Sequence, residues 1–294
     1  MSSGFGLAPP PKLGKTPFRA DEFSDDIVLV TGGGTGLGKA IALEFGRIGA
    51  KVCIASRSSD HIESGLKYLQ EYGVTARGYT LDIRSEQSVR DTFAKISSEI
   101  GFPNILVNNA AGNFPVAAEE LTPNGFRSVV DIVLNGTFLC SREIARYHIG
   151  HKSRACILNI GASYSWTGGP GFVHSASAKA GVKAMTETLA VEWAPYGIRV
   201  NSLVPGLFPH EDETSHIKAT PGRLDSDNLR APALRAGAPR ELGWAAAFLC
   251  SRYASYITGH TMVVDGANWQ RRFMTQPEFI SVRDQLGLGD FQES

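Results

Sequence analysis

Residues 31–38, Thr31-Gly32-Gly33-Gly34-Thr35-Gly36-Leu37-Gly38, form the most informative stretch of this chain. An apolar β-type run, Ile27-Val28-Leu29-Val30, precedes it, and a helical pattern over residues 36–48 follows it. The glycines let the backbone turn tightly and approach a phosphate, and the helix N-terminus presents N–H groups and a positive dipole end. The stretch therefore predicts a cradle for a cofactor diphosphate. Its expected contacts are Gly32, Gly34, Thr35, Gly36, Leu37 and Gly38.

Two other nucleotide motifs overlap this stretch without fitting it. In the dinucleotide pattern G-x-G-x-x-G, Leu37 stands where the third glycine belongs. Residues 33–39 match the phosphate loop of nucleoside triphosphatases, G-x-x-x-x-G-K, but Ala40 follows where that loop needs Ser or Thr for magnesium. A triphosphatase is therefore disfavoured, although this motif alone does not exclude it.

The composition indicates a globular protein. Of 294 residues, 43% are hydrophobic and 20% are charged, and the formal net charge is zero, which argues against nucleic acid as the main partner. No apolar run approaches the length of a membrane span. The four cysteines are far apart and form no C-x-x-C pair, so we expect small buried thiols and no metal site.

Seven short apolar runs alternate with helical patterns along the chain. The runs are 27–30, 51–56, a weaker one at 75–81, 105–108, 156–160, 198–204 and 261–264. The helical patterns lie at about 36–48, 60–72, 85–100, 122–149, 173–195 and 239–251. Short, nearly unbroken runs are typical of strands buried on both faces. The order predicts an α/β protein with a single doubly wound, Rossmann-type, parallel seven-stranded sheet that has helices on both faces.

The same pattern predicts one main domain with two appendages. Residues 1–22 contain Pro9-Pro10-Pro11 and form an N-terminal arm without a helix, residues 23–270 form the domain, and residues 271–294 form a C-terminal tail. The polar, proline-rich span 207–236 is expected to be a lid over the site.

The ends of the second to fourth strands suggest a cofactor. Arg57 and Ser58 follow the second strand, where an acid would bind the ribose of NAD and an arginine accommodates the 2′-phosphate of NADP. NADPH is therefore expected. Asp82 follows the third strand and is expected to accept a hydrogen bond from adenine, while Asn109, Ala110 and Ala111 follow the fourth and would let the cofactor lie against the backbone.

Together these motifs resemble the short-chain dehydrogenase/reductase family over about residues 24–268. The resemblance rests on residues 31–38, Asn109-Ala110-Ala111-Gly112, Pro205-Gly206 and Asp265-Gly266. It adds Pro205, Gly206 and Leu207 to the expected cofactor contacts. The family's catalytic pair is Tyr-x-x-x-Lys, but here Ser175 precedes Lys179, and Ala162 replaces the usual serine. An ordinary alcohol or ketone reductase is therefore disfavoured, because a serine hydroxyl is too weak an acid to protonate an alkoxide.

A subgroup of that family, the 2,4-dienoyl-CoA reductases, is similar at these positions. It carries the forms found here at Asn108–Phe114, Asp131–Thr137 and Ser175–Val182, and its working tyrosine lies on the loop after the fifth strand, where this chain has Tyr164. The resemblance implies that Tyr164 and Asn113 bind a dienolate oxygen, that Lys179 holds the nicotinamide ribose, and that Ser175 orients its neighbours.

The resemblance also implies partners and further roles. Arg84 is expected to face a phosphate of coenzyme A and Phe114 to form an apolar lip for the acyl-CoA substrate, while Asn135 matches a helix-kinking asparagine. Neither nucleic acid nor a membrane is an expected partner. A homotetramer is expected. The C-terminal residues Phe291-Gln292-Glu293-Ser294 are not a peroxisomal signal, so we expect a cytoplasmic or mitochondrial-matrix location.

Three alternatives remain open at this point. A trans-2-enoyl-CoA reductase would use the same fold and cofactor. A non-catalytic NADP-binding sensor would account for the missing tyrosine at position 175. An ordinary ketoreductase is the weakest alternative, because of Ser175.

Overall fold

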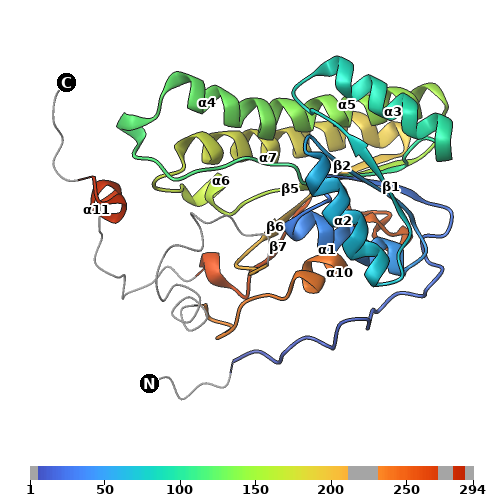
Figure 1. Cartoon of the computed structure of the whole chain (residues 1–294), viewed down its shortest axis with the longest axis horizontal. Coiled ribbons are helices and arrows are strands. Elements are labelled where there is room, and N and C mark those ends of the chain that lie inside the picture. Colours follow the sequence, from blue (N-terminus) through green and yellow to red (C-terminus); the bar gives the residue numbers. More distant parts are fainter. Residues whose placement is uncertain (1–5, 211–230, 271–280, 289–294) are drawn as a thin grey trace.

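A computed structural model of the chain describes residues 6–210, 231–270 and 281–288 (Figure 1). Seven strands form one parallel sheet in the order β3-β2-β1-β4-β5-β6-β7. The strands are β1 (Ile27–Thr31), β2 (Lys51–Ser56), β3 (Ala76–Thr80), β4 (Ile105–Asn108), β5 (Ala155–Ile160), β6 (Ile198–Pro205) and β7 (Thr261–Val264). The predicted doubly wound sheet is confirmed.

Helices cover both faces of this sheet (Figure 1). One face carries α1 (Gly36–Arg47), α2 (Ser59–Glu71) and α10 (Pro239–Cys250). The other carries α3 (Glu86–Ile100), α4 (Pro123–Val130), α5 (Gly136–Gly150) and α7 (Val173–Trp193). Two short helices, α6 (Tyr164–Thr167) and α11 (Val282–Leu286), lie outside these layers.

Strand β1 shows why the apolar runs are unbroken. All five of its residues are buried, and the four apolar ones alternate between two cores. Val28 and Val30 pack in the core under α1 and α10, whereas Ile27 and Leu29 pack in the core under α3 and α5. A strand with a hydrophobic core on each side is apolar on both faces, and the polar Thr31 lies only at its end. The four cysteines are free and buried, as expected from their apolar surroundings.

Helical boundaries differ from the prediction in two places. The single helix expected over 122–149 is divided by a π-helical segment, Asp131–Asn135, between α4 and α5. Such segments often lie at functional sites. The short helix α6 was not predicted, because four residues are too few for a helical hydrophobic pattern.

The carboxyl ends of all seven strands lie on one edge of the sheet. Strand order reverses between β1 and β4, which pair in parallel through Val28–Ile105 to Val30–Val107. A crevice opens at such a switch point, because the connections leave it toward opposite faces. The glycine-rich turn follows β1 directly, so the fold places it in this crevice.

Part of the proposed lid and tail lies outside the described residues. Of the lid, residues 207–210 and 231–236 are described, and of the tail only 281–288. In the described part of the arm, residues 6–22, there is no helix.

Candidate active site

The glycine-rich turn is shaped by close packing. Gly32 and Gly36 have φ angles of +65° and +52°, which favour glycine. A Cβ on Gly34 would lie 2.1 Å from the carbonyl oxygen of His61 in α2, and a Cβ on Gly38 would lie 2.4 Å from the Asn109 side chain. The turn therefore needs glycine for its own packing. Thr35, the residue before α1, makes no side-chain capping bond to the helix.

Thr31 ties the turn to the loop after β4. Its hydroxyl accepts hydrogen bonds from the backbone N–H groups of Asn109 and Ala110, each at 3.1 Å. The Asn109 amide donates in turn to the carbonyl oxygens of Thr31 and Gly32. The predicted cofactor residues Asn109 and Ala110 thus lie beside the glycine turn, and Asn109 uses its side chain to hold that turn.

The residues expected near adenosine, Arg57, Ser58 and Asp82, lie after β2 and β3, and Arg84, expected near coenzyme A, follows Asp82. Arg57 is exposed at the end of β2, while the Ser58 hydroxyl accepts from the His61 N–H and caps α2. The Arg84 guanidinium forms an ion pair with Asp82 at 2.6 Å, and its hydrogen bond lowers the pKa of that carboxyl. The structure thus pairs the residue expected near adenine with the residue expected near coenzyme A. Their ligand contacts stay predictions.

Three of the predicted catalytic residues meet at the end of β5. The hydroxyl groups of Tyr164 and Ser175 share a hydrogen bond of 3.0 Å. Tyr164 is the first residue of α6, and Gly169 packs against it so closely that a Cβ there would lie 3.0 Å from the Tyr164 Cβ. Burial raises the pKa of the Tyr164 phenol, so the hydroxyl keeps its proton and can donate a hydrogen bond.

Lys179 lies one turn further along α7 from Ser175. Its side chain is buried, and its ammonium donates to the carbonyl oxygen of Ile160, the last residue of β5. Burial lowers the pKa of Lys179 to about 8, because the ammonium loses its water and no carboxylate among the described residues offsets that loss. A buried cation without a paired anion indicates a functional role, since such a group costs stability.

Asn113 lies on the neighbouring loop after β4. Its side-chain oxygen accepts from the Phe114 N–H, and its exposed amide nitrogen makes no hydrogen bond within the described residues. The Phe114 ring packs against His174, with centroids 4.6 Å apart. Since His174 directly precedes Ser175 in α7, this contact brings the Asn113 loop to the helix that carries Ser175 and Lys179. Asn135, by contrast, donates to Asp131 at 2.8 Å.

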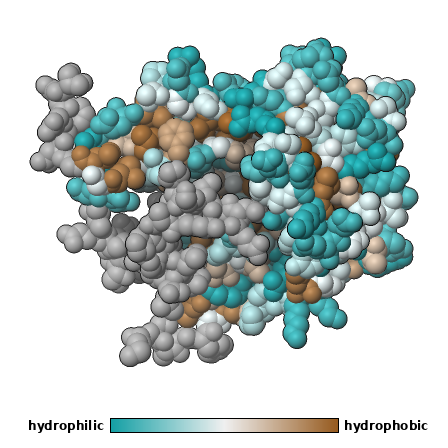
Figure 2. All heavy atoms as spheres, in the orientation of Figure 1, coloured by the Kyte–Doolittle hydropathy of each residue, from teal (hydrophilic) through white to brown (hydrophobic). Residues whose placement is uncertain are grey.

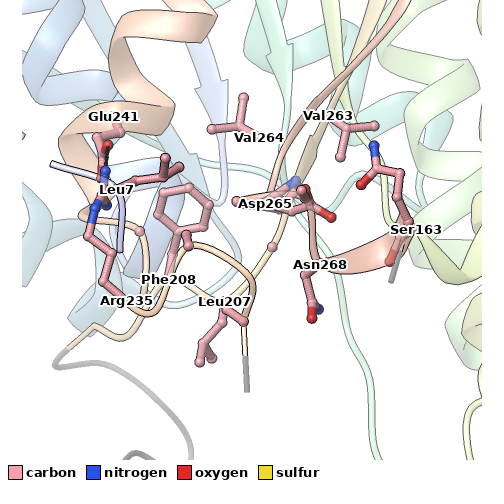
Figure 3. A pocket seen from close by; sticks show the side chains of 18 of the residues that line it. Leu7, Ser163, Leu207, Phe208, Arg235, Glu241, Val263, Val264, Asp265 and Asn268 are labelled. Atoms are coloured by element: carbon pink, nitrogen blue, oxygen red, sulfur yellow. Dashed lines mark hydrogen bonds and ion pairs between the residues drawn. The ribbon is translucent and has the colours of Figure 1, made fainter. Parts of the chain in front are cut away.

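A cavity of about 750 Å³ opens beside Tyr164 (Figure 3). It collects the predicted residues Tyr164, Pro205, Gly206 and Leu207, together with Ala162. In Figure 3, Ser163 and Asn268 lie on one side of it, and Leu7, Phe208, Arg235 and Glu241 lie on the other. Asn113, Phe114, Ser175 and Lys179 are not among its walls. Its volume is that of a typical small-molecule site.

The face beside this site is partly apolar. In Figure 2, hydrophobic residues gather over α4, α6 and the start of α7, next to atoms drawn in grey. Phe114 and Val173 are each 40% exposed. Exposed apolar groups at the opening of a site suit a ligand with a hydrocarbon part.

Two histidines near the site were not predicted. His174 is fully buried, and neither of its ring nitrogens has a hydrogen-bond partner in the described part of the chain. Burial lowers its pKa, so it is neutral. His210 lies over the glycine turn, with its Cε1 atom 3.0 Å from where a Cβ on Gly36 would be. Neither histidine has a spacing pattern of its own. His174 directly precedes the predicted segment 175–182, which is the one signal that the sequence offers for it. His210 approaches residues 31–38 only in the folded chain.

The described ranges contain no group of three or more His, Cys, Asp or Glu side chains that could hold a metal ion. Among the helices described, none combines the length and hydropathy that crossing a bilayer requires. The donors that the site presents are the hydroxyl groups of Tyr164 and Ser175, the amide of Asn113 and the ammonium of Lys179. These groups can bind a dinucleotide and stabilise an oxyanion.

Comparisons with known proteins show which family this chain resembles. Residues 32–267 match the family described as Enoyl-(Acyl carrier protein) reductase. The chain is 40% identical over 243 residues to a probable (2E)-enoyl-CoA-producing 2,4-dienoyl-CoA reductase of Bacillus subtilis, covering 82% of this chain and 96% of the relative. It is 38% identical over 280 residues to a probable (3E)-enoyl-CoA-producing 2,4-dienoyl-CoA reductase 3 of Caenorhabditis elegans, covering 90% and 88%.

Solved structures show the same fold. A short-chain dehydrogenase from Bacillus anthracis has a TM-score of 0.78 and 38% identity, covering 85% of this chain and 99% of that one. A gluconate 5-dehydrogenase from Burkholderia cenocepacia, solved in complex with NADP and tartrate, has a TM-score of 0.79 and 27% identity, covering 86% and 98%.

Proposed function

This chain belongs to the short-chain dehydrogenase/reductase family, and we propose that it reduces 2,4-dienoyl-CoA thioesters with NADPH. The observation that carries the proposal is the position of Tyr164. Its hydroxyl lies 3.0 Å from that of Ser175, the residue that stands where the family has its tyrosine. The phenol is thus held at Ser175, which lies one helical turn before Lys179 on α7.

The residues suit the charge that this reaction develops. Hydride added to the δ carbon of a dienoyl thioester moves an electron pair onto the thioester oxygen, giving a dienolate. The Tyr164 hydroxyl and the Asn113 amide would donate to that oxygen, and one such donor is worth about 3–4 kcal/mol of barrier. Lys179 would hold the nicotinamide ribose and place positive charge near the anion. NADPH supplies the hydride, and a proton completes the product.

The position of the proton decides the product. Protonation of the dienolate at the α carbon leaves the double bond at C3, and protonation at the γ carbon leaves it at C2. The relatives differ in this respect, since one is named for a (2E) product and another for a (3E) product. We propose the 3-enoyl product, because Tyr164 and Asn113 would hold the thioester end of the dienolate beside the α carbon.

The direct test is NADPH consumption with 2,4-decadienoyl-CoA and with trans-2-decenoyl-CoA, with the product identified by mass spectrometry and NMR. Deuteride from labelled NADPH is expected at the δ carbon of the dienoyl substrate. Turnover of the mono-ene alone would overturn the assignment in favour of an enoyl-CoA reductase, the candidate that the matching family's description favours. NADPH binding without turnover of either thioester would indicate a sensor.

The assembly and location are also proposals. We propose a homotetramer that uses α5 and α7, on which Phe138 and Val191 are 41% and 78% exposed. Light scattering after size exclusion tests this assembly. We propose a cytoplasmic or matrix location, which fractionation of the source cells tests.

A further inference from the structure

We infer that the N-terminal arm forms the far wall of the substrate cavity and that Leu7 limits the length of the acyl chain. This inference rests on the proposed function, because it assigns the cavity to the acyl part of that substrate. Leu7 lies about 157 residues before Tyr164 in sequence, yet both line the same cavity. In Figure 3, Leu7 is on the side of the cavity with Phe208, Arg235 and Glu241, away from Ser163.

Three hydrogen bonds hold the backbone of the arm at this place. The Leu7 N–H donates to the Ala233 carbonyl oxygen at 3.0 Å. The Arg235 Nε donates to the Ala8 carbonyl oxygen at 3.1 Å, and the Arg240 Nε donates to the Pro11 carbonyl oxygen at 2.8 Å. Gly6 has a φ angle of +70°, and a Cβ there would lie 2.6 Å from the Ala233 carbonyl oxygen. The arm thus follows one path along residues 233–240.

The anchor for the arm is itself held in place. Arg235 forms a two-pronged ion pair with Glu241, with both N···O distances 2.8 Å. Glu241 also accepts from the Ala238 N–H at the start of α10. A guanidinium held at both nitrogens has little freedom, so the arm contacts a fixed surface. The ion pair neutralises the charge on this wall.

The far wall offers apolar side chains beside a neutralised ion pair. At the arm it consists of Leu7 and Phe208 together with the paired Arg235 and Glu241 (Figure 3). Leu7 is nevertheless 60% exposed, so it is not a core residue that stabilises the fold. An exposed leucine that lines a cavity gains burial only when a ligand or a neighbouring segment covers it. The tail of an acyl chain whose thioester lies at Tyr164 would reach this wall.

The test is to narrow the cavity at the arm. Leu7→Trp is expected to lower kcat/KM for 2,4-decadienoyl-CoA about tenfold or more, because pocket contacts of one or two carbon atoms carry discrimination of this size. The value for 2,4-hexadienoyl-CoA should stay within about twofold. Leu7→Ala should shift the preference toward longer chains.

Two control variants distinguish a residue that limits the acyl chain from residues that only hold the arm in place. Leu13→Trp changes an arm leucine that is 43% exposed and does not line the cavity, so neither substrate should respond. Arg240→Ala removes a contact to the arm outside the cavity and is expected to affect both chain lengths alike. Equal effects of Leu7→Trp on short and long substrates, or no effect, would overturn the inference.

A binding measurement keeps this test independent of turnover. Calorimetric titration with hexanoyl-CoA and decanoyl-CoA in the presence of NADP should show the same selective loss in Leu7→Trp. If the unmodified protein reduces no dienoyl-CoA but Leu7→Trp loses binding of the longer thioester selectively, the proposed function is wrong and the role of Leu7 is supported. If the unmodified protein reduces the dienoyl-CoA and Leu7→Trp shows no such selectivity, only the role of Leu7 is wrong.

Discussion

The two halves of the ligand edge of the sheet are built in different ways. The half proposed for the cofactor, at the ends of β1 to β4, is a network in which Thr31, Gly32, Asn109 and Ala110 hold one another through hydrogen bonds of 3.0–3.2 Å. The half proposed for the substrate, at the ends of β5 to β7, has separate hydrogen bonds, such as Tyr164 to Ser175 and Lys179 to Ile160, beside a cavity whose walls come from distant segments.

This difference separates two kinds of function. A diphosphate is the same in every dinucleotide, so a fixed backbone cradle can serve many reactions. A substrate varies, so its site is assembled from loops and termini that can change without disturbing the sheet. If the halves are separable in this way, changes in one should alter cofactor affinity and changes in the other should alter turnover.

Among these tests of the two halves, Tyr164→Phe should change the measured values most. Removing the hydroxyl takes one donor from the dienolate, so kcat should fall about 10²- to 10³-fold. The dissociation constant for NADPH, measured by fluorescence quenching, should change less than about twofold, because the phenyl ring still fills the cavity. Tyr196→Phe removes the hydroxyl of a tyrosine that is 53% exposed in the 3-10 turn Ala194–Tyr196, which follows α7, and should change neither value. An unchanged kcat for Tyr164→Phe would refute its proposed role.

Gly34→Ala should break the cofactor half. Its new Cβ would meet the His61 carbonyl oxygen, a backbone atom that cannot turn aside. We expect NADPH to bind at least about tenfold more weakly and the protein to lose about 1–3 kcal/mol of unfolding free energy. Gly150→Ala, where nothing lies within 4 Å, is the matched control and should leave both quantities nearly unchanged. Normal NADPH affinity in Gly34→Ala would show that the turn does not contact the diphosphate.

The sequence predicted the sheet well because its signals are local. Nearly unbroken apolar runs located six of the strands, and a weaker run, 75–81, located β3. The glycine turn and Asn109 could be placed from neighbouring residues, whereas the role of Lys179 came from the family resemblance. Position 164 needed the family resemblance, since a tyrosine after a strand has no pattern of its own. Leu7 and His174 could not be predicted. Each is defined by a contact with a residue far along the chain, Ala233 for Leu7 and Phe114 for His174, and no periodicity records such contacts.

The titration of Lys179 should set the upper end of the pH range in which the enzyme is active. Burial lowers its pKa to about 8, so it is charged below that pH and neutral above it. If its charge supports the dienolate, kcat/KM should fall about tenfold per pH unit above pH 8. Lys183, on the exposed side of the same helix in an ion pair with Glu187, is the control: Lys183→Met should keep this profile. A flat profile to pH 10 would count against a role for the ammonium charge.

The same burial has a consequence for stability. The unfolded lysine keeps its proton up to its usual pKa of 10.5, whereas the folded one loses it from about pH 8. The unfolded state therefore binds more protons in this window, and stability should rise with pH through it. A difference of 10.5 − 8 = 2.5 pKa units corresponds to about 3 kcal/mol. Lys179→Met should remove this rise in urea-unfolding measurements, and its persistence would assign the rise to another group.

Arg57 gives the smallest expected effect and the sharpest test of the cofactor half. Its guanidinium is exposed at the end of β2, so a contact with the 2′-phosphate of NADPH would be worth only about 1 kcal/mol, or about fivefold in the dissociation constant. Arg57→Ala should weaken NADPH by that amount and leave NADH unchanged, because NADH has no 2′-phosphate. Arg90→Ala, on the exposed face of α3, should affect neither cofactor. Since salt screens exposed charges, the Arg57 effect should shrink at high ionic strength, whereas the Gly34→Ala effect, which is steric, should not. If Arg57→Ala lowers the affinity for NADPH and NADH equally, the residue shapes the turn after β2 and does not contact the 2′-phosphate.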